Sequence, residues 1–518
     1  MNMKSIYNSL LLFVFLTASI NTFADKKPSE KLNILFITVD DMNWDSPGIY
    51  GNKIKSISPN IDGLAEGGIR FQHAYVQSPN CSPSRGVFQS GLYPHTSGMR
   101  GFYFVDLPHE TLPQILLKEG YYTGVINKAI DSSFSPDFDD TWNYYDKIDG
   151  KEKRIPSTYY KHMNKFFSEA KKNKKPFYGV VNIADPHKLF YNDPGTQKEG
   201  YVNHPPSIIY KKNEVEIPEF LPNHPKIQQE ITNYYNSVKR ADDCLGAVLA
   251  SLKNAGAEKN TIVIFVSDHG MALPFAKSSC YQNGVKTPWI IKWPGKIKQN
   301  TVEKEMMISA VDFMPTVLDI LSINKPEHLQ GISFLPTLEG KKQKQTELVF
   351  TEFNENAGGT PRPIRGIHSK KYNYVFNSWA TGDLIFKSAA QSHASYKTMK
   401  QMAQTDIDVK RRFDYLNHRA VEELYDLEKD PNALNNLIDD PKYADIVRQM
   451  RGEMQNWMEN TDDYLLTAFL AKEDKAKLAE LMAKEEKEAY FRASSLKWKR
   501  HKNTSGKTKG HTKLYIVQ

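Results

Sequence analysis

Several short apolar runs in the first part of the chain have the pattern of strands that are buried on both faces. Each is a nearly continuous stretch of aliphatic and aromatic residues rather than an alternation of apolar and polar positions. These runs cover residues 32–40, 122–126, 176–183, 261–266 and 288–293. Helical patterns over residues 111–119 and about 227–252 lie between them. Strands that alternate with helices predict an α/β fold with a large mixed, mainly parallel sheet flanked by helices.

Polar side chains follow three of these runs at the point where the strand ends. Asp40 and Asp41 come after the first strand, His187 after the third, and Asp268 with His269 after the fourth. Because ligands of such sheets bind outside the carboxyl ends of the strands, we expect a functional site there. Carboxylate oxygens are the ligands that Ca²⁺ and Mg²⁺ prefer. An Asp-Asp pair alone is also common in turns and helix caps, and the second acidic strand end favours the metal.

The later part of the chain has shorter strand patterns and is predicted to form a smaller antiparallel sheet packed by a helix. The strands are expected over residues 347–351, 365–368, 372–376 and 423–427, and the helix over 443–457. Residues 471–490 are rich in Ala, Glu, Lys and Leu and predict an exposed terminal helix. We therefore divide the chain into a signal peptide (1–24), an N-terminal domain (25–345), a C-terminal subdomain (346–465) and a terminal helix with a basic tail (466–518).

The N-terminus has the pattern of a signal peptide. Lys4 precedes an apolar run over residues 10–20, and Ala24 stands before the expected cleavage point. The run is too short to span a bilayer, and no later segment is long and apolar enough to do so. No cysteine stands at the cleavage point, which disfavours a lipoprotein anchor. We expect an exported protein, periplasmic or secreted, without a membrane span.

The formal net charge of +8 is concentrated at the C-terminus. Residues 497–513 hold seven Lys or Arg and no acid, whereas the rest of the chain after the signal peptide is formally neutral. This distribution argues against a nucleic-acid-binding body with a broad basic face. The tail either holds a polyanion nearby by charge attraction or is a frayed, solvated terminus, and we favour the latter. The three cysteines are too few for a disulfide scaffold, and we expect Cys244 and Cys280 to remain thiols.

The pentapeptide Cys81-Ser82-Pro83-Ser84-Arg85 lies in the sequence between the two acidic strand ends, Asp40-Asp41 before it and Asp268 after it. This order resembles the type I, formylglycine-dependent sulfatases of the alkaline-phosphatase superfamily. Residues 309–316, 330–333 and 423–437 also resemble core and C-terminal segments of that family, so the resemblance covers about residues 32–460. Together with residues 94–99, the pentapeptide is most similar to that of heparan N-sulfatases and bacterial sulfatases of polysaccharides such as ulvan and carrageenan. The resemblance implies an alkaline-phosphatase-like fold.

The resemblance also implies how Cys81 would act. A formylglycine-generating enzyme or an anaerobic sulfatase-maturing enzyme would convert Cys81 to an aldehyde, which hydrates to a geminal diol. One hydroxyl attacks sulfur, and loss of the proton from the second expels sulfate, so a difficult step is divided into two easier ones. Arg85 matches the side chain that holds the formylglycine hydroxyl.

Further site residues follow from the same resemblance. Asp40, Asp41, Asp268 and His269, together with residue 81, would hold one divalent cation, with Ca²⁺ favoured and Mg²⁺ possible. Lys128 and Lys277 match the two lysines that bind sulfate, and fixed cations stabilise the charge that develops on sulfuryl oxygens. His187 matches the histidine that contacts the sulfate or the leaving-group oxygen. Taken alone, a single lysine is more often a solvated surface charge.

Ile130 departs from the family pattern. The family places a histidine at this position, two residues after the first lysine, and an isoleucine cannot hydrogen-bond a hydroxyl or accept its proton. Either another histidine substitutes, with His95 and His109 as candidates, or the second step relies on different residues.

The first interpretation is a sulfatase that acts on a sulfated polysaccharide or its oligosaccharides, with an algal polymer such as ulvan favoured. The alternatives are an N-sulfoglucosamine (heparan) sulfohydrolase, a phosphonate monoester or phosphodiester hydrolase, and a non-catalytic glycan-binding relative. No nucleic-acid partner is expected.

Overall fold

The computed structural model describes residues 31–148, 150, 152–197, 203–344, 346–357 and 360–507, with the side chains of 197 and 493–507 left out. The expected signal peptide, residues 1–24, lies outside the described residues. Among the described residues, no helix is long and apolar enough to cross a membrane.

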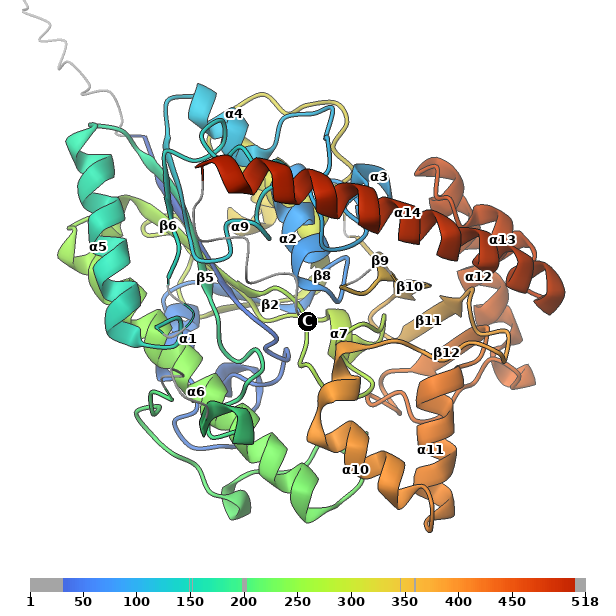
Figure 1. Ribbon diagram of the computed structural model, residues 1–518. Helices are drawn as coiled ribbons and strands as arrows, with labels where there is room; N and C mark the ends of the chain where they lie inside the picture. The colour runs from blue at the N-terminus through green and yellow to red at the C-terminus, as the bar shows by residue number, and fades with distance from the viewer. Residues whose placement is uncertain are drawn as a thin grey trace, which may run out of the picture. The chain divides into compact units, whose positions relative to one another are not determined.

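The N-terminal part is built on an eight-stranded mixed sheet (Figure 1). Its strands are β1 (Asn33–Val39), β2 (Ile69–Tyr75), β3 (Tyr122–Ile126), β4 (Tyr144–Asp146), β5 (Phe177–Ile183), β6 (Thr261–Ser267), β7 (Trp289–Lys292) and β8 (Thr301–Ser309). Their order is β4-β3-β5-β1-β6-β7-β2-β8. Only β7 runs antiparallel to its neighbours. The predicted fold class, a large mixed and mainly parallel sheet, is therefore confirmed.

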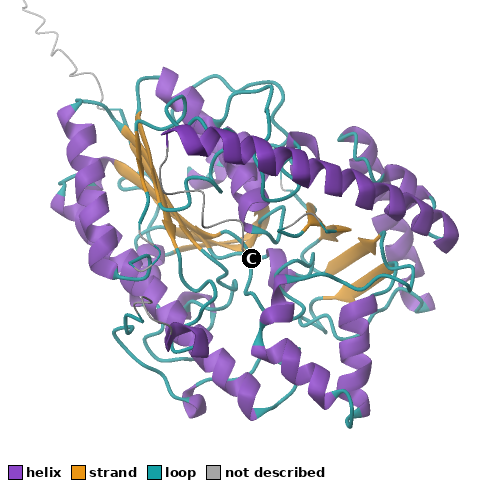
Figure 2. Ribbon diagram, in the orientation of Figure 1, coloured by secondary structure: helices purple, strands orange, loops and turns teal. Residues whose placement is uncertain are grey.

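Helices cover both faces of this sheet (Figure 2). The helices of the N-terminal part are α1 (Pro59–Glu66), α2 (Cys81–Ser90), α3 (Pro94–Ser97), α4 (Leu112–Lys118), α5 (Pro156–Lys172), α6 (Pro225–Asn254), α7 (Gln282–Val285), α8 (Phe313–Ile320) and α9 (Leu335–Leu338). Successive residues of a strand point to opposite faces. Phe36 of β1 accordingly packs on Phe88 of α2 and Phe313 of α8. On the other face, Phe166 of α5 lies against Gly179 of β5, next to Leu35. This double coverage explains the continuous apolar runs.

The C-terminal part contains a four-stranded antiparallel sheet of β9 (Val349–Glu355), β10 (Pro361–His368), β11 (Tyr372–Asn377) and β12 (Glu422–Asp426). Helices α10 (Ala394–Met402) and α11 (Ile407–His418) come between β11 and β12, and α12 (Ala444–Asn460) and α13 (Leu466–Leu470) follow β12. The predicted sheet and the helix over 443–457 are confirmed. A Cβ at Gly366 of β10 would lie 2.8 Å from the Cβ of Cys280, so this sheet packs closely on the segment before α7.

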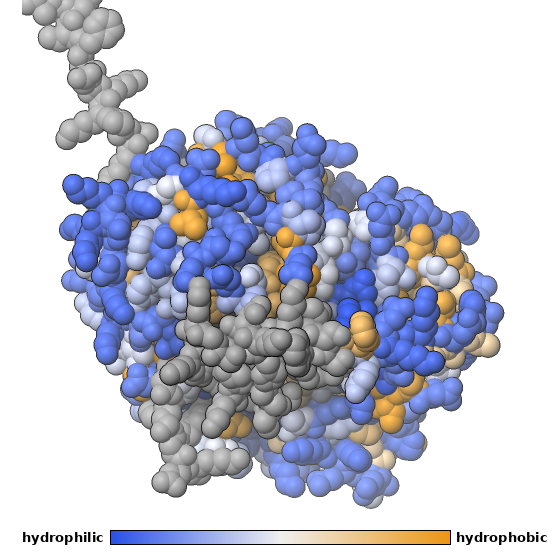
Figure 3. All heavy atoms as spheres, turned by 45° about the horizontal axis from the view of Figure 1, so that its top comes forward, coloured by the Kyte–Doolittle hydropathy of each residue, from blue (hydrophilic) through white to orange (hydrophobic). Residues whose placement is uncertain are grey.

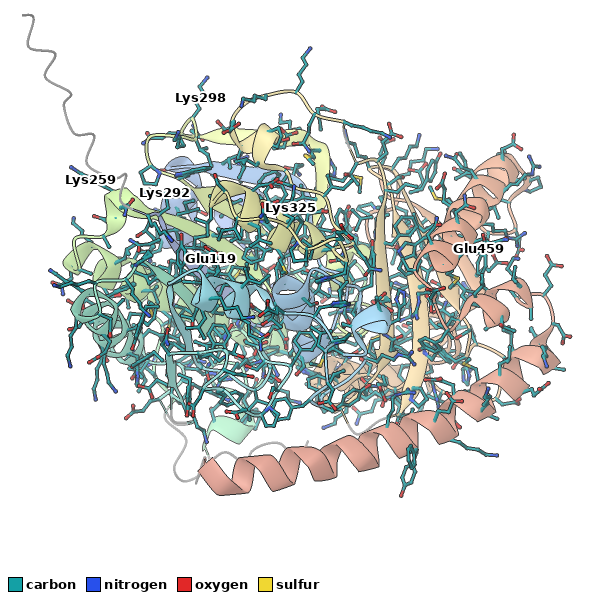
Figure 4. All side chains as sticks on the ribbon, turned by 90° about the horizontal axis from the view of Figure 1, so that it is seen from above. Glu119, Lys259, Lys292, Lys298, Lys325 and Glu459 are labelled. Atoms are coloured by element: carbon teal, nitrogen blue, oxygen red, sulfur yellow. The ribbon has the colours of Figure 1, made fainter. Side chains whose placement is uncertain are left out.

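The last helix, α14 (Lys475–Lys507), is longer than the helix expected over residues 471–490. Arg362 of β10 forms an ion pair with Glu486 of this helix, with 2.8 Å between Nη1 and Oε1. The backbone is helical as far as Lys507, so the expected frayed terminus does not begin at residue 497. The face in Figure 3 is mainly hydrophilic, with hydrophobic residues in small separate groups. Lys259 and Lys298 point outward in Figure 4, as expected for solvated charges.

The register of the large sheet positions the strand ends. Val39 of β1 lies opposite Ile183 of β5 and Ser267 of β6. The ladder continues for one step, because the Asp268 N–H donates to the Val39 carbonyl (3.0 Å). The Asp40 N–H donates to the Asp185 carbonyl (3.2 Å). The three segments that carry the predicted site residues therefore leave the sheet side by side.

Candidate functional site

Cys81 is the first residue of α2, and its side chain faces the carboxyl ends of β1 and β6. Asn80 before it is extended, and the Asn80 carbonyl accepts the first helical bond, from the Ser84 N–H (2.9 Å). The Cys81 Sγ lies 3.6 Å from Asp40 Oδ1, 3.4 Å from His269 Nε2 and 3.5 Å from Lys277 Nζ. Burial raises the pKa of the Cys81 thiol well above its ordinary value. The unmodified thiol is thus kept neutral and is poorly suited to act as a thiolate nucleophile.

Three carboxylates converge beside this sulfur. Asp40, Asp41 and Asp268 are all buried. Asp41 has a left-handed backbone (φ 67°), which is uncommon for a residue other than glycine, and its N–H donates to Asp268 Oδ1 (3.1 Å). Burial, followed by repulsion from Asp40, raises the pKa of Asp268 to about 8. The cluster therefore concentrates negative charge that side chains or a cation have to balance.

His269 completes the cluster as a neutral imidazole. Its Nδ1–H donates to the Gly270 carbonyl (2.9 Å), so the Nε2 lone pair faces the carboxylates, 3.2 Å from Asp41 Oδ1. Burial, and then the charge of Lys277, lowers the pKa of His269 to about 3. A side chain at Gly270 would collide with the Asn283 carbonyl, at 1.8 Å from the added Cβ, which explains the glycine after this histidine.

These residues fit a divalent cation. One donor atom each from Asp40, Asp41, Cys81 and His269 lie within 4.8 Å of one another. The Oδ2 atom of Asp41 is buried and has no hydrogen-bond partner. Asp268 stands at the margin of this group, with Oδ1 3.7 Å from His269 Nε2 and Oδ2 paired with Arg85. The donor set is mostly carboxylate oxygen, which suits a hard cation.

Three cationic side chains pair with the three carboxylates. Lys277 Nζ lies 2.7 Å from Asp41 Oδ1, Lys128 forms an ion pair with Asp40 Oδ2, and Arg85 Nη2 lies 2.9 Å from Asp268 Oδ2. The side chains of Lys277 and Lys128 are only 5% and 16% exposed, so neither is a solvated surface charge. Burial lowers the pKa of Lys277, but the combined attraction of Asp41 and the other anionic groups around it outweighs burial, and the net shift is upward.

His187 is held at the same edge by a buried arginine pair. Asp185 accepts from Arg154 Nε (2.9 Å) and from Arg240 Nε (2.6 Å), and Arg154 Nη2 donates to the His187 carbonyl (2.8 Å). Burial lowers the pKa of His187 to about 4, against the opposing fields of Asp41 and Asp40. Sequence reasoning missed both arginines, because they come from positions 31 and 55 residues away from Asp185 and follow no local pattern.

Ile130 is 6% exposed and packs in the hydrophobic core. The two candidate histidines lie elsewhere: His95 Nδ1 is 3.1 Å from Glu352, and the exposed His109 stacks on His328. No described contact joins either to Cys81. Asp131, which sequence reasoning missed, instead accepts from the Ser82 hydroxyl and lies 3.9 Å from Lys128 Nζ.

Comparisons with known proteins agree with this geometry. The sulfatase family model matches residues 32–323, and the C-terminal model of N-sulphoglucosamine sulphohydrolase matches residues 268–384. The chain is 28% identical to human N-sulphoglucosamine sulphohydrolase, covering 83% of this chain and 90% of that protein. It is 25% identical to an ulvan-active sulfatase of Formosa agariphila, covering 83% and 75%.

Solved structures share the fold. A 2-O GAG sulfatase superposes with a TM-score of 0.64 at 22% identity, over 84% of this chain and 93% of the other. The phosphonate monoester hydrolase of Agrobacterium radiobacter gives a TM-score of 0.61 at 17% identity, over 83% and 96%. At these identities the structures show an alkaline-phosphatase-like architecture and no more. The sulfatase family model matches more than half of the chain, and the predicted site residues lie together. The chain therefore belongs to the sulfatase family and is a sulfatase.

Proposed function

We propose that this sulfatase hydrolyses sulfate esters of a sulfated polysaccharide or its oligosaccharides, with an algal polymer such as ulvan as the first candidate. The observation that carries the proposal is the position of Cys81, buried at the start of α2 between carboxylates, His269 and Lys277. The ulvan-active relative supports the polymer, and the signal-peptide pattern supports an exported enzyme, periplasmic or secreted. We retain the domain division at residues 345 and 465 as part of this proposal.

We further propose that a maturing enzyme converts Cys81 to formylglycine. The hydrated aldehyde would supply an oxygen nucleophile that the neutral thiol lacks. Arg85, which pairs with Asp268 and lies 3.6 Å from Asp40, keeps these carboxylates beside residue 81. Asp131 holds the next residue, Ser82, and so orients the first turn of α2.

Asp40, Asp41, Asp268 and His269 would hold one divalent cation, for which Ca²⁺ is the first candidate. The cation would supply positive charge beside residue 81. The neutral state and the orientation of His269 suit a ligand, because its second nitrogen is fixed by the Gly270 carbonyl. Mg²⁺ remains the alternative on the same oxygen donors.

We assign the binding of sulfuryl oxygens to Lys128 and Lys277, and contact with the sulfate or leaving-group oxygen to His187. Both lysines are largely withdrawn from water, where a fixed charge stabilises a developing negative charge more strongly. The low pKa of His187, about 4, keeps its imidazole neutral, and its Nδ1–H donates to the Lys188 carbonyl (2.6 Å), so Nε2 can accept a hydrogen bond from a protonated leaving-group oxygen without adding charge.

An N-sulfoglucosamine sulfohydrolase is the second candidate. The match of the C-terminal model to residues 268–384 and the 28% identity to the human enzyme favour it. The phosphonate hydrolase shares only the fold, and a non-catalytic glycan-binding role disagrees with the sulfatase assignment.

A sulfate-release screen over ulvan, carrageenan and heparin fragments tests the proposal, with Cys81→Ala as the inactive control. We expect release from ulvan oligosaccharides, whereas release from N-sulfated heparin fragments alone would support the second candidate. Faster hydrolysis of phosphonate or phosphate esters than of every sulfated glycan would overturn both.

A further inference from the structure

Arg419, at the end of α11, is a buried arginine without an acceptor. It is 8% exposed, and its backbone has a positive φ of 56°. Its Nε and Nη2 atoms are enclosed and have no hydrogen-bond partner among the described residues. Leaving a buried donor unpaired is costly, more so for a charged group. A strained, unsatisfied cation of this kind calls for a ligand or a special role.

Arg412, two turns earlier on the same helix, has the same deficit. Its Nη1 donates to the Ala433 carbonyl (3.2 Å), but Nε and Nη2 are enclosed and unpartnered. The guanidinium groups of Arg412 and Arg419 lie 3.6 Å and 5.6 Å from the ring centre of Phe275. Burial lowers the pKa of Arg412, and Arg419 lowers it further against the opposing Tyr281 and Tyr425.

One carboxylate, Glu423, lies near this pair and offsets only part of its charge: burial lowers the pKa of Arg419, and Tyr281 and then Glu423 raise it, with a net upward shift. Glu423 accepts from Asn377 (2.9 Å) through Oε1, and from Tyr281 and Tyr425 through Oε2. In the described part of the chain, no carboxylate lies within ion-pair distance of Arg412 or Arg419. The two guanidinium groups therefore have an excess of positive charge, and the Arg412 residue is partly exposed.

The pair is connected to the segment that carries Lys277. Phe275, on which both arginines stack, lies two residues before Lys277. The Ser388 hydroxyl donates to the Lys277 carbonyl (3.4 Å), and the ring of Phe386, two residues earlier, lies 4.9 Å from the Arg419 guanidinium. Figure 1 shows α7, which follows this segment, between the two sheets, with α10 below it in this view.

We propose that Arg412 and Arg419 form an anion subsite for a second acidic group of the substrate, a carboxylate or a further sulfate on the glycan. This inference rests on the proposed function. A planar guanidinium group binds carboxylate and sulfate oxygens in pairs, which a lysine cannot do. The unpaired nitrogens are enclosed in this structure, so the partly exposed Arg412 side chain would turn toward the occupant, which then supplies the acceptors that these nitrogens lack. The enzyme thus selects substrates with a second negative charge close to the sulfate that is removed.

The test compares three substrates: a sulfated disaccharide with a uronate carboxylate, the same disaccharide with that carboxylate reduced to an alcohol, and an aryl sulfate. Arg412→Gln and Arg419→Gln are measured beside Arg411→Gln, whose side chain is 77% exposed on the same helix. We expect kcat/KM on the uronate disaccharide to fall about tenfold more than on the other two substrates, since a charge-assisted bidentate contact is lost. A disulfated disaccharide without uronate distinguishes sulfate from carboxylate as the occupant.

Equal losses on all three substrates would show that the arginines only support the Lys277 segment, and no loss on any would also overturn the subsite. If Arg419→Gln does not fold, the half-buried Arg412→Gln decides. Calorimetric binding of the uronate disaccharide to Cys81→Ala protein, with and without Arg412→Gln, tests the subsite independently of catalysis. Binding that depends on Arg412, together with no sulfate release by the unsubstituted protein on any substrate, would refute the proposed function but keep the subsite.

Discussion

Two buried ionic clusters of this enzyme differ in how completely their charges are partnered. At the small sheet, Arg365 binds Asp463 through two nitrogens and lies 3.3 Å from Glu352, so the charges of these three side chains are all paired, although the buried Nε2 of the neighbouring His95 has no partner. In the large sheet, Asp41 keeps an unpartnered oxygen, and two of the three cations are lysines, which act as point charges. A saturated network holds a fold together, whereas an unsaturated one is prepared to receive a ligand.

The largest effect is expected where the saturated network is broken. Arg365→Met leaves Asp463 and Glu352 buried without their cation, which costs about 3–5 kcal/mol of unfolding free energy. Arg448→Met removes a surface pair with Asp445, with 78% of the Arg448 side chain exposed, and should change stability by less than about 1 kcal/mol. Urea unfolding of both variants measures the difference. A similar, small loss for both would mean that the buried network is not structural.

The second prediction concerns turnover at the unsaturated cluster. Lys128→Ala and Lys277→Ala should each lower kcat about a hundredfold or more, by analogy with the loss of one donor to a developing anion. Lys298→Ala, an exposed lysine that points outward in Figure 4, is the control and should be close to unaltered. Steady-state kinetics on an aryl sulfate checks this. Lysine variants that behave like the control would contradict the assigned sulfate contacts.

Cation removal should separate the two clusters further. Chelation leaves three carboxylates together at the strand ends, so activity should disappear and the melting temperature should fall. At a hundredfold excess over its Kd, a cation that binds only the folded state stabilises it by about 2.7 kcal/mol. Thermal unfolding with chelator and with added Ca²⁺ or Mg²⁺ measures this shift. Full activity and an unchanged melting temperature after exhaustive chelation would argue against these ligands.

A pH experiment on Glu230 gives the smallest effect. Burial raises the pKa of this α6 carboxylate, but the His393 imidazole, 3.3 Å away, and the Ser395 N–H, which donates to Oε2 (2.6 Å), lower it more, to about 2. In the unfolded chain Glu230 has its ordinary pKa of 4.5, so the lowered pKa stabilises the fold fully at pH values above 4.5. This stabilisation is lost as the pH falls from 4.5 towards 2. Glu230→Gln should therefore cost about 2 kcal/mol at pH 7 and progressively less below pH 4.5. A loss independent of pH in this window would contradict the lowered pKa of Glu230.

The sequence predicts the parts of this enzyme that depend on local pattern. Strands β1, β5 and β6 are continuous apolar runs because both faces are covered, and their carboxyl ends bring Asp40, Asp41 and Asp268 together. Strand β8 was missed because its exposed half is polar, and α10 and α11 because they are polar insertions between two predicted strands. The side chains that support the site were also missed.

Those supporting residues have no signal in a single sequence. Arg154 reaches Asp185 from a turn before α5 and Arg240 reaches it from α6, and Asp131 reaches Ser82 from a turn after β3. Their contacts exist only once the chain has folded. The departure at Ile130 was visible, but the two histidines considered as substitutes contact Glu352 and His328. A pattern identifies residues that share an element, whereas contacts between distant elements require coordinates.

The most direct test of the central claim is mass spectrometry of the tryptic peptide that contains Cys81, isolated from active protein and compared with its specific activity. The account predicts that the thiol is replaced by an aldehyde and that activity rises in proportion to the modified fraction. Fully active protein with a wholly unmodified Cys81 would contradict the account.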